Sequence, residues 1–420
     1  MRPNILYIHS HDTGRCIQPY GHPVPTPNLH RLAEQGVMFR NAFSVAPSCS
    51  PSRAGMLTGQ YPHQCGMFGL AHVGWSLDDY RRHLLHTLRE QADYYSKLVG
   101  FQHVIDWPEA RKIGYDEVWG GNNDALAHQV VGPATEFLRN APDRPWFFSV
   151  GIIQTHRLAP HQFFHRDEPK GDARHIRPPG PLPDHPTVRA DFADFAESAR
   201  ELDEAVGTVL DELERQGLAG DTLVIATTDH GIPFPRCKCT LYDGGTGVYL
   251  IMRGPGGFAG GRVIEPLASH IDVFPTLCDL LEIDTPHWLE GRSLLPLVRG
   301  EADSIREEVF TEQTYHVRLC PLRAVRTERY KLIRSFGPRP VLYGGDGPTQ
   351  RLYREWGHEE AVSEGDELYD LHLDPQENRN LIEDPAHTEV RESLNGRLEQ
   401  WMRRTGDPLV EGEIPEPAPQ

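Results

Sequence analysis

Three apolar runs along the chain each pass directly into a polar segment. Residues 5–8 lead into 9–12, residues 146–153 into 154–157, and residues 222–226 into 227–231. Near-continuous apolar strands of this kind are typical of a parallel sheet that is covered on both faces. We therefore expect each run to be a buried β-strand that ends in a polar turn.

A helical pattern precedes the third of these strands. Its apolar residues recur at helical spacing: Leu202, Val206, Val209 and Leu213. Gly217 follows them and is a suitable residue to end the helix. Strand and helix in alternation indicate a doubly wound α/β domain with a mostly parallel sheet. Because ligands bind beyond the carboxyl ends of the strands in such sheets, the three polar segments are expected to meet at one crevice.

Other parts of the chain depart from this alternation. Residues 159–186 are rich in Pro, His and charge, which predicts a long surface loop over the crevice. Residues 322–326 and 330–333 are expected to form a short antiparallel pair, and a final helix is expected near 388–403. We predict a catalytic α/β domain over residues 1–308 and a smaller C-terminal α+β subdomain over residues 309–420.

Composition and charge exclude several classes of function. The 420 residues include 42 Lys and Arg against 60 Asp and Glu, so the net charge is −18, which argues against a nucleic-acid partner. No run of about 18 apolar residues is present, so no membrane span is predicted. The N-terminus lacks the pattern of a secretory signal, and we expect a cytoplasmic protein, or a periplasmic one if a leader has been removed. Seven cysteines are too few, and odd in number, for a disulfide scaffold.

The sharpest chemical signal is the segment Cys-Ser-Pro-Ser-Arg-Ala-Gly-Met-Leu-Thr-Gly at residues 49–59. Pro51 suits the first position of a helix and Ser50 suits its cap, so Cys49 is expected just outside the helix and facing solvent. Free amide groups and the helix dipole favour an anion there, and Arg53 adds a positive charge one turn later. By itself the pattern also fits a buried structural cysteine.

This segment is similar to that of a known family. Cys-x-Pro-Ser-Arg followed by Leu-Thr-Gly resembles the signature of the type I sulfatases in the alkaline phosphatase superfamily. Further similar blocks span nearly the whole chain, and they most resemble those of heparan N-sulfatases (sulfamidases). The blocks are residues 39–43, 188–191, 221–225, 229–235 and 367–370. The resemblance implies an alkaline-phosphatase-like α/β fold.

The resemblance implies a modified nucleophile at Cys49. In the family, a maturation enzyme that reads Cys-x-Pro-x-Arg oxidises this cysteine to formylglycine, and one hydroxyl of the hydrated aldehyde attacks sulfur. The other hydroxyl then expels sulfate as the aldehyde re-forms, so water never has to attack a sulfate ester. Arg53, in the same segment, is expected to be a catalytic residue.

The resemblance also implies a divalent cation, usually calcium, at the ends of the first and third strands. The matching positions are Asp12, Asp229 and His230, with Cys49 beside them. Oxygen-rich ligation suits Ca²⁺ or Mg²⁺. The family usually has two acidic residues at the first site, whereas this chain has His11 before the aspartate, and two imidazoles leave Mn²⁺ or Zn²⁺ open.

Three further residues match family positions that act on the sulfate or the leaving group: Lys238, His156 and His103. Lys238 would hold the sulfate, and His156 would assist the leaving group. The family's Gly-Lys-x-His segment has Phe101 in place of the lysine, so one positive charge is missing from the anion pocket. Arg157 is the candidate that replaces this charge, because its fork can contact two sulfate oxygens.

Together these residues predict a sulfatase that hydrolyses a sulfate ester or an N-sulfate on a small sulfated saccharide. A phosphonate monoester or phosphodiester hydrolase of the same superfamily is the first alternative, since sulfur and phosphorus centres look alike to such a pocket. A non-catalytic sulfosugar-binding protein is the second, if Cys49 is never converted. The sequence leaves the metal, the sugar and a homo-oligomer open.

Overall fold

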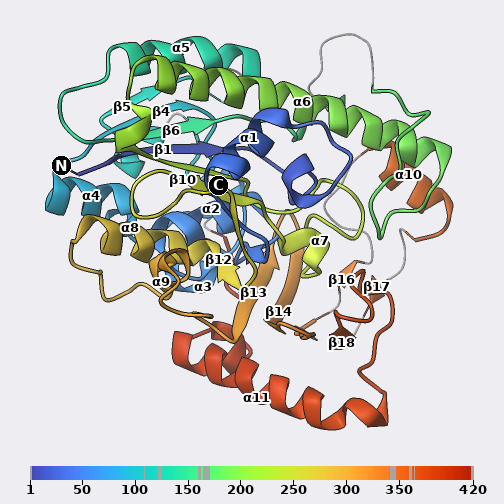
Figure 1. Ribbon diagram of the computed structural model, residues 1–420. Coiled ribbons are helices and arrows are strands. Elements are labelled where there is room, and N and C mark those ends of the chain that lie inside the picture. Colours follow the sequence, from blue (N-terminus) through green and yellow to red (C-terminus); the bar gives the residue numbers. More distant parts are fainter. Residues whose placement is uncertain are drawn as a thin grey trace.

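Figure 1 shows the chain as a computed structural model, in which helices cover both faces of a large sheet and a smaller sheet lies beside the final helix. None of the helices among the described residues is long and apolar enough to cross a membrane. The structure describes residues 2–107, 109–121, 125–158, 162–163, 171–337, 339–340, 347–358, 362–363 and 365–417.

The large sheet contains eight strands in the order β11-β2-β10-β9-β1-β6-β4-β5. β10 runs antiparallel to both of its neighbours, and the other pairings are parallel, which confirms the predicted mostly parallel sheet. In the order of the sheet, the strands are Arg262–Ile264, Val37–Phe39, Leu250–Arg253, Thr222–Thr227, Asn4–His9, Trp146–Gly151, Tyr95–Gly100 and Glu117–Trp119.

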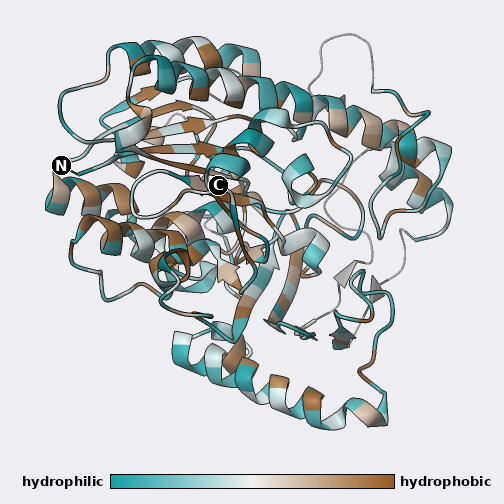
Figure 2. Cartoon of the chain, viewed as in Figure 1, coloured by the Kyte–Doolittle hydropathy of each residue, from teal (hydrophilic) through white to brown (hydrophobic). Residues whose placement is uncertain are grey.

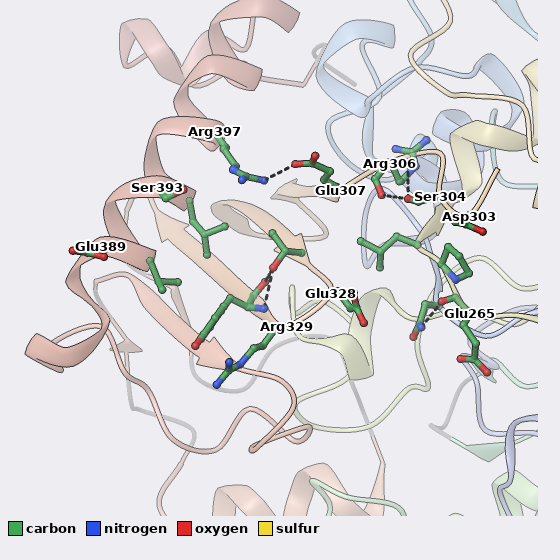
Figure 3. A pocket seen from close by; sticks show the side chains of 17 residues that line it. Glu265, Asp303, Ser304, Arg306, Glu307, Glu328, Arg329, Glu389, Ser393 and Arg397 are labelled. Carbon is green, nitrogen blue, oxygen red and sulfur yellow. Dashed lines mark hydrogen bonds and ion pairs between the residues drawn. The ribbon is translucent and has the colours of Figure 1, made fainter.

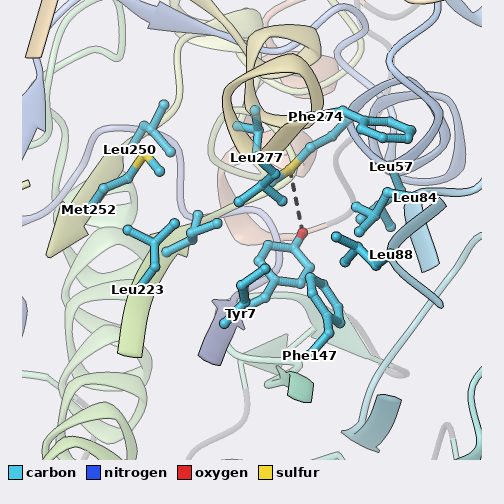
Figure 4. Packing of buried hydrophobic residues seen from close by; sticks show 14 of the residues in the cluster. Tyr7, Leu57, Leu84, Leu88, Phe147, Leu223, Leu250, Met252, Phe274 and Leu277 are labelled. Atoms are coloured by element: carbon cyan, nitrogen blue, oxygen red, sulfur yellow. Dashed lines mark hydrogen bonds between the residues drawn. The ribbon is translucent and has the colours of Figure 1, made fainter. Parts of the chain in front are cut away.

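Alternate residues of each central strand enter opposite halves of the core. In β1, Leu6 packs with one cluster and Tyr7 with the other, as expected for a sheet covered on both faces. The first cluster lies under α1 (Pro27–Gln35), α5 (Ala127–Arg139) and α6 (Pro186–Arg215). Figure 4 shows the second, where Tyr7 and its neighbours meet α2 (Cys49–Thr58), α4 (Leu84–Ala92) and α8 (Val273–Leu281).

The predicted helix before β9 is present, but it is far longer than its strongest apolar repeat suggested. α6 begins at Pro186, and His185 caps it by accepting a hydrogen bond from the Thr187 amide. The apolar stripe continues through Phe192 and Phe195, which pack in a separate cluster beyond the edge of the sheet. The expected loop at 159–186 therefore ends where this helix starts, and residues 159–161 and 164–170 lie outside the described residues.

The C-terminal part forms a second, antiparallel sheet in the order β13-β14-β15-β18. Its strands are Glu308–Tyr315, Leu319–Thr327, Tyr330–Ser335 and Glu367–Asp370, so the predicted pair is the middle of four strands. The predicted final helix is α11 (Thr388–Thr405), whose Leu398 and Trp401 pack against the sheet. Figure 2 shows hydrophobic and hydrophilic residues interspersed along α11. The division of the chain at residue 308 stays a prediction.

Short elements connect these layers. They are α3 (Pro62–Cys65), α7 (Asp243–Thr246), α9 (Leu295–Arg299) and α10 (Pro348–Glu355), with the strand pairs β3 (Ala42–Phe43) and β12 (Ala268–Ser269), β7 (Arg157–Leu158) and β8 (Gln162–Phe163), and β16 (Arg339–Pro340) and β17 (Val362–Ser363).

Candidate active site

The polar segments after β6, β1 and β9 meet at one edge of the large sheet. These three strands are direct neighbours, with β1 in the middle. The Ser10 amide donates to the Thr227 carbonyl at 3.0 Å, and the Thr155 amide donates to the His11 carbonyl at 2.7 Å. The predicted convergence of segments more than 200 positions apart is therefore confirmed.

Five potential metal ligands from these segments and from α2 gather there. One ligand atom from each of His11, Asp12, Cys49, Asp229 and His230 lies within 4.8 Å of all the others. Asp12 has a left-handed backbone (φ 58°), and its amide donates to Asp229 Oδ1 at 2.8 Å. These are the residues that the sequence predicted as metal ligands, and the fold brings all five together.

The protonation of this cluster suits a cation. Burial by itself raises the pKa of the Asp12 and Asp229 carboxyls, but the surrounding cationic groups and imidazoles hold both pKa values well below their usual range. Burial lowers the pKa of His11 and of His230 to about 4, although the two carboxylates oppose it. Two carboxylates and two neutral imidazoles are thus available as ligands at neutral pH, and this donor set fits a divalent cation.

Cys49 lies deeper than the sequence suggested. α2 begins at Cys49 with Ser48 as its N-cap, so Pro51 occupies the third helical position, where its missing N–H is not needed. The expectation that Cys49 lies outside the helix and faces solvent is wrong, because the residue is only 2% exposed. Its sulfur lies 3.4 Å from His230 Nε2, and burial raises the pKa of the thiol to about 12.

Arg53 joins the start of α2 to the sheet edge. Its guanidinium donates to Asp229 Oδ2 at 3.0 Å and to the Ser10 carbonyl at 2.9 Å, and its Nη1 lies 2.7 Å from His9 Nδ1. The side chain is buried. Arg53 is therefore a fixed positive charge within the cluster. The ends of β1 and β9 hold its guanidinium in place.

Lys238 and His156 contact the same carboxylate. Lys238 Nζ lies 2.8 and 3.0 Å from the two oxygens of Asp12. Burial lowers the pKa of Lys238, but Asp12 together with the neighbouring cysteines raises it above its usual value, so the amine stays charged. His156 Nδ1 lies 2.7 Å from Asp12 Oδ2, and its ring stacks on His11 with centroids 4.1 Å apart. The fold thus places both predicted sulfate-side residues beside the metal cluster.

Phe101 and His103 follow a fourth parallel strand, β4, at the same sheet edge. The Phe101 ring lies 4.9 Å from the His11 ring, and the Arg53 guanidinium lies over it at 5.1 Å. His103 Nε2 lies 2.9 Å from His72 Nδ1. The position that usually holds a lysine therefore lines this site with an apolar ring.

Arg157 contacts α6 and the segment around Pro233. Its Nη1 lies 2.8 Å from Asp191 Oδ1, its Nε donates to the Pro233 carbonyl, and its guanidinium lies over the rings of Phe163 and Phe234. Asp191 also accepts hydrogen bonds from the amide and hydroxyl of Thr349. A buried ion pair accounts for these contacts, and a role of Arg157 in sulfate binding stays a prediction.

Sequence reasoning missed several residues that complete the site. His9 holds Arg53, and Ser52 donates to the Asp229 carbonyl at 2.5 Å. Ser48 Oγ lies 2.8 Å from His316 Nδ1. The position of His9 at a strand end and of Ser52 in the cysteine segment could have signalled them. No local pattern could have signalled His316, because it comes from the second sheet.

A separate cavity, of about 820 Å³, lies elsewhere on the chain. Figure 3 shows its lining between α11 and the segment before β13, and none of the predicted site residues belongs to it. Several of its charged side chains are already paired, as Arg397 is with Glu307 and Arg329 with Asp370. The candidate chemistry therefore lies at the sheet edge and not in this cavity.

Comparisons with known proteins agree with this geometry. The sulfatase family profile matches residues 3–283, and the profile of the N-sulphoglucosamine sulphohydrolase C-terminal region matches residues 236–339. The N-sulphoglucosamine sulphohydrolase of Homo sapiens is 32% identical, and the alignment covers 97% of this chain and 91% of that protein.

Solved structures show the same fold. A 2-O GAG sulfatase superposes with a TM-score of 0.77 at 23% identity, covering 99% of this chain and 95% of its own. A phosphonate monoester hydrolase of Agrobacterium radiobacter superposes with a TM-score of 0.72 at 22% identity, covering 96% of each chain. At such identities the likeness shows the fold alone, and it is the predicted alkaline-phosphatase-like fold. Since the sulfatase profile covers more than half of the chain and the human relative aligns with nearly all of it, the chain belongs to the sulfatase family.

Proposed function

We propose that this sulfuric ester or sulfamate hydrolase acts on a small sulfated saccharide, with an N-sulfate as the first candidate group. The human relative, named for N-sulphoglucosamine, and the matching C-terminal profile support this choice of substrate. The single observation that carries the mechanism is the environment of Cys49, which begins a helix inside a cluster of metal ligands.

An unmodified Cys49 is a poor nucleophile in this position. Burial raises the pKa of its thiol to about 12, so the thiol stays protonated at neutral pH, and the thiolate is the nucleophilic form. Conversion to formylglycine by a maturation enzyme removes this obstacle. The converted residue supplies the nucleophile for sulfur, and a bound divalent cation supplies positive charge to the sulfate oxygens.

The other residues of the site hold charge and protons around the sulfate. Arg53 and Lys238 are buried positive charges on opposite sides of the carboxylate pair, since one contacts Asp229 and the other Asp12. Fixed charges in a dry site stabilise charge that develops in the transition state better than water does. His156 is held through Nδ1 by Asp12, which leaves its Nε2 to exchange a proton with the leaving group.

The cation would be held by the carboxylates of Asp12 and Asp229 with the imidazoles of His11 and His230. We propose Ca²⁺, because both charged ligands are oxygens. Thermal denaturation of the metal-free protein with added Ca²⁺, Mg²⁺, Mn²⁺ or Zn²⁺ tests this, since an ion that binds only the folded state raises the melting temperature. A larger rise with Zn²⁺ or Mn²⁺ than with Ca²⁺ would assign the site to the softer metal.

The proposed function is tested by mass spectrometry and kinetics on the same sample. The protein is produced with and without a formylglycine-generating enzyme, and the mass of the peptide that contains Cys49 gives the converted fraction. Hydrolysis of N-sulfoglucosamine should scale with that fraction and be absent in Cys49→Ala. Activity that is independent of conversion would overturn the mechanism. Protein that binds sulfosugars but is never converted at Cys49, even with the formylglycine-generating enzyme present, would favour a binding protein.

A phosphonate monoester or phosphodiester hydrolase is the second candidate, and the structural likeness to the Agrobacterium enzyme favours testing it. Parallel kcat/KM measurements on an aryl sulfate and an aryl phosphonate monoester separate the two activities. We expect the sulfate to be the better substrate.

A further inference from the structure

A small cavity lies beside the candidate active site, where α2, the start of α4 and the segment after β4 meet. Ten residues line it, and all of them except His103 are buried. Its volume is about 10 Å³, which is close to the smallest volume that holds one water molecule. Arg53 and His103 belong both to this lining and to the predicted catalytic residues, so the contents of the cavity bear on the site.

Three buried nitrogens of this lining have no hydrogen-bond partner among the described residues. They are Arg53 Nε, His83 Nε2 and His103 Nδ1. The other polar side chains of the lining are bonded within the protein, namely those of Tyr7, His9, Gln102 and Tyr115. Buried nitrogens of native proteins are almost always hydrogen-bonded, and an ordered water is the usual partner where the protein offers none. Three such nitrogens around one cavity therefore indicate a ligand in it.

The nitrogens of His83 and Arg53 are both donors. His83 caps α4 by accepting a hydrogen bond at Nδ1 from the Leu85 amide, at 3.3 Å. Burial lowers the pKa of His83 to about 3, so the ring is neutral and its single proton lies on Nε2. Arg53 Nε always carries a proton, and the Nη atoms of that guanidinium already bond the ends of β1 and β9. The ligand must therefore accept two hydrogen bonds.

His103 contributes the third nitrogen. Burial lowers the pKa of its ring well below the usual range, so this imidazole is also neutral and carries one proton. Its Nε2 lies 2.9 Å from His72 Nδ1, and a proton on Nε2 serves that contact and leaves Nδ1 as an acceptor. A ligand that accepts two hydrogen bonds and donates one then satisfies all three nitrogens. Water does this within the volume available, whereas a halide ion is larger and cannot donate.

We propose that this cavity binds one ordered water molecule, which accepts hydrogen bonds from Arg53 Nε and His83 Nε2 and donates one to His103 Nδ1. The water connects two residues of the candidate active site to the start of α4. His83 is thereby a positioning residue, because it acts on Arg53 and His103 through the water. The effect on turnover rests on the proposed function, whereas the water site does not.

Diffraction tests the water site without any turnover. Crystals of the wild-type protein are grown with sodium bromide in place of chloride, and data are collected at a resolution that shows ordered water. We expect one density peak within hydrogen-bonding distance of all three nitrogens, with no anomalous signal from bromide at that position. A cavity without a peak, or a bromide signal in it, would overturn the proposal.

Two variants of His83 separate its positioning role from its role as the cap of α4. In His83→Asn the side-chain oxygen still accepts from the Leu85 amide, but no donor reaches the cavity. In His83→Gln the longer amide reaches the cavity as a donor, but the cap is lost. His86→Gln is the matched control, because His86 lies on the same helix and is not among the residues that line the cavity.

We expect His83→Asn to lose about tenfold in kcat on N-sulfoglucosamine per converted enzyme, the equivalent of about 1.4 kcal/mol. KM should stay within about twofold, because Arg53 keeps its charge and its bonds to the strand ends. His83→Gln should lose less turnover although it unfolds at lower urea, and His86→Gln should resemble the wild type. Turnover that follows the urea midpoints instead would overturn the positioning role. A wild type that shows the water but hydrolyses no sulfate would overturn the proposed function and leave the water site standing.

Discussion

Replacing Arg157 with alanine separates two roles for this residue, because each role places the lost free energy in a different measurement. If the guanidinium binds sulfate, its removal lowers substrate turnover and leaves folding stability unchanged. If it pairs with Asp191 and packs on Phe163 and Phe234, its removal lowers folding stability. The contacts of Arg157 with Asp191, Phe163 and Phe234 favour the second role.

The magnitude follows from the burial of the ion pair. Both side chains are largely excluded from solvent, with 6% of Arg157 and 2% of Asp191 exposed, so solvent screens the pair weakly. Removing one partner of a buried pair leaves the other charge uncompensated and costs about 3–5 kcal/mol. A charged contact to sulfate is worth about 1.5–3 kcal/mol, which is roughly tenfold to 150-fold in kcat/KM.

The assay is urea denaturation of Arg157→Ala and Asp191→Asn beside kcat/KM of the folded, converted proteins. We expect both variants to unfold at clearly lower urea, because each removes one charge of the buried ion pair. Arg157→Ala should keep its kcat/KM within about threefold under conditions where it is folded. An unchanged unfolding midpoint with a loss of 100-fold or more in turnover would refute this reasoning and return Arg157 to the anion pocket.

Two further predictions concern buried charge. Burial raises the pKa of Glu377 to about 7 despite its ion pair with Lys331, so the free energy of unfolding should fall by up to about 3 kcal/mol as pH rises from about 4.5 to 7. Glu377→Gln should abolish that slope in urea denaturation at pH 5 and pH 7.5, and an unchanged slope would assign the titration elsewhere. Phe101→Lys places a second cation beside Arg53, so it should bind inorganic sulfate more tightly in inhibition assays but unfold at lower urea than the wild type.

The mostly parallel sheet and the core of the site were predictable from sequence for a physical reason. Apolar runs that end in polar segments specify buried parallel strands, and the carboxyl ends of such strands lie at one edge. Asp12, His156 and Asp229 therefore come together without any knowledge of the side-chain contacts. The family motif then supplied what spacing alone could not, namely that Cys49 belongs to the same edge.

The errors arose where local signals competed with tertiary contacts. Pro51 is tolerated anywhere in the first turn, so it did not fix the first residue of α2, and the burial of Cys49 depends on neighbours distant in sequence. Arg157 is a separate case: its guanidinium contacts Asp191 of α6, and its role in sulfate binding stays a prediction. The contact of Ser48 with His316 requires the packing of two sheets against each other, which no short pattern encodes.

The charges of the site connect its two departures from the usual family pattern. This chain has His11 where the family usually has an acid, and Phe101 where it usually has a lysine, so it lacks one negative and one positive charge. The two rings lie 4.9 Å apart, so the missing charges would have been neighbours. Asp12 and Asp229 remain balanced by Arg53 and Lys238, because burial keeps the imidazoles of His11 and His230 neutral.

This balance accounts for the missing lysine, while a role of Arg157 in sulfate binding stays a prediction. A divalent cation and the sulfate dianion released as product add equal and opposite charges to a neutral cluster, and a buried charge is stable only when it is compensated. His11→Asp alone and Phe101→Lys alone each add one uncompensated charge, whereas the double variant adds a pair. We therefore expect the double variant to unfold at higher urea than either single variant, with a coupling free energy of about 1–3 kcal/mol in a double-mutant cycle. Additive losses in that cycle would mean that the two replacements are independent.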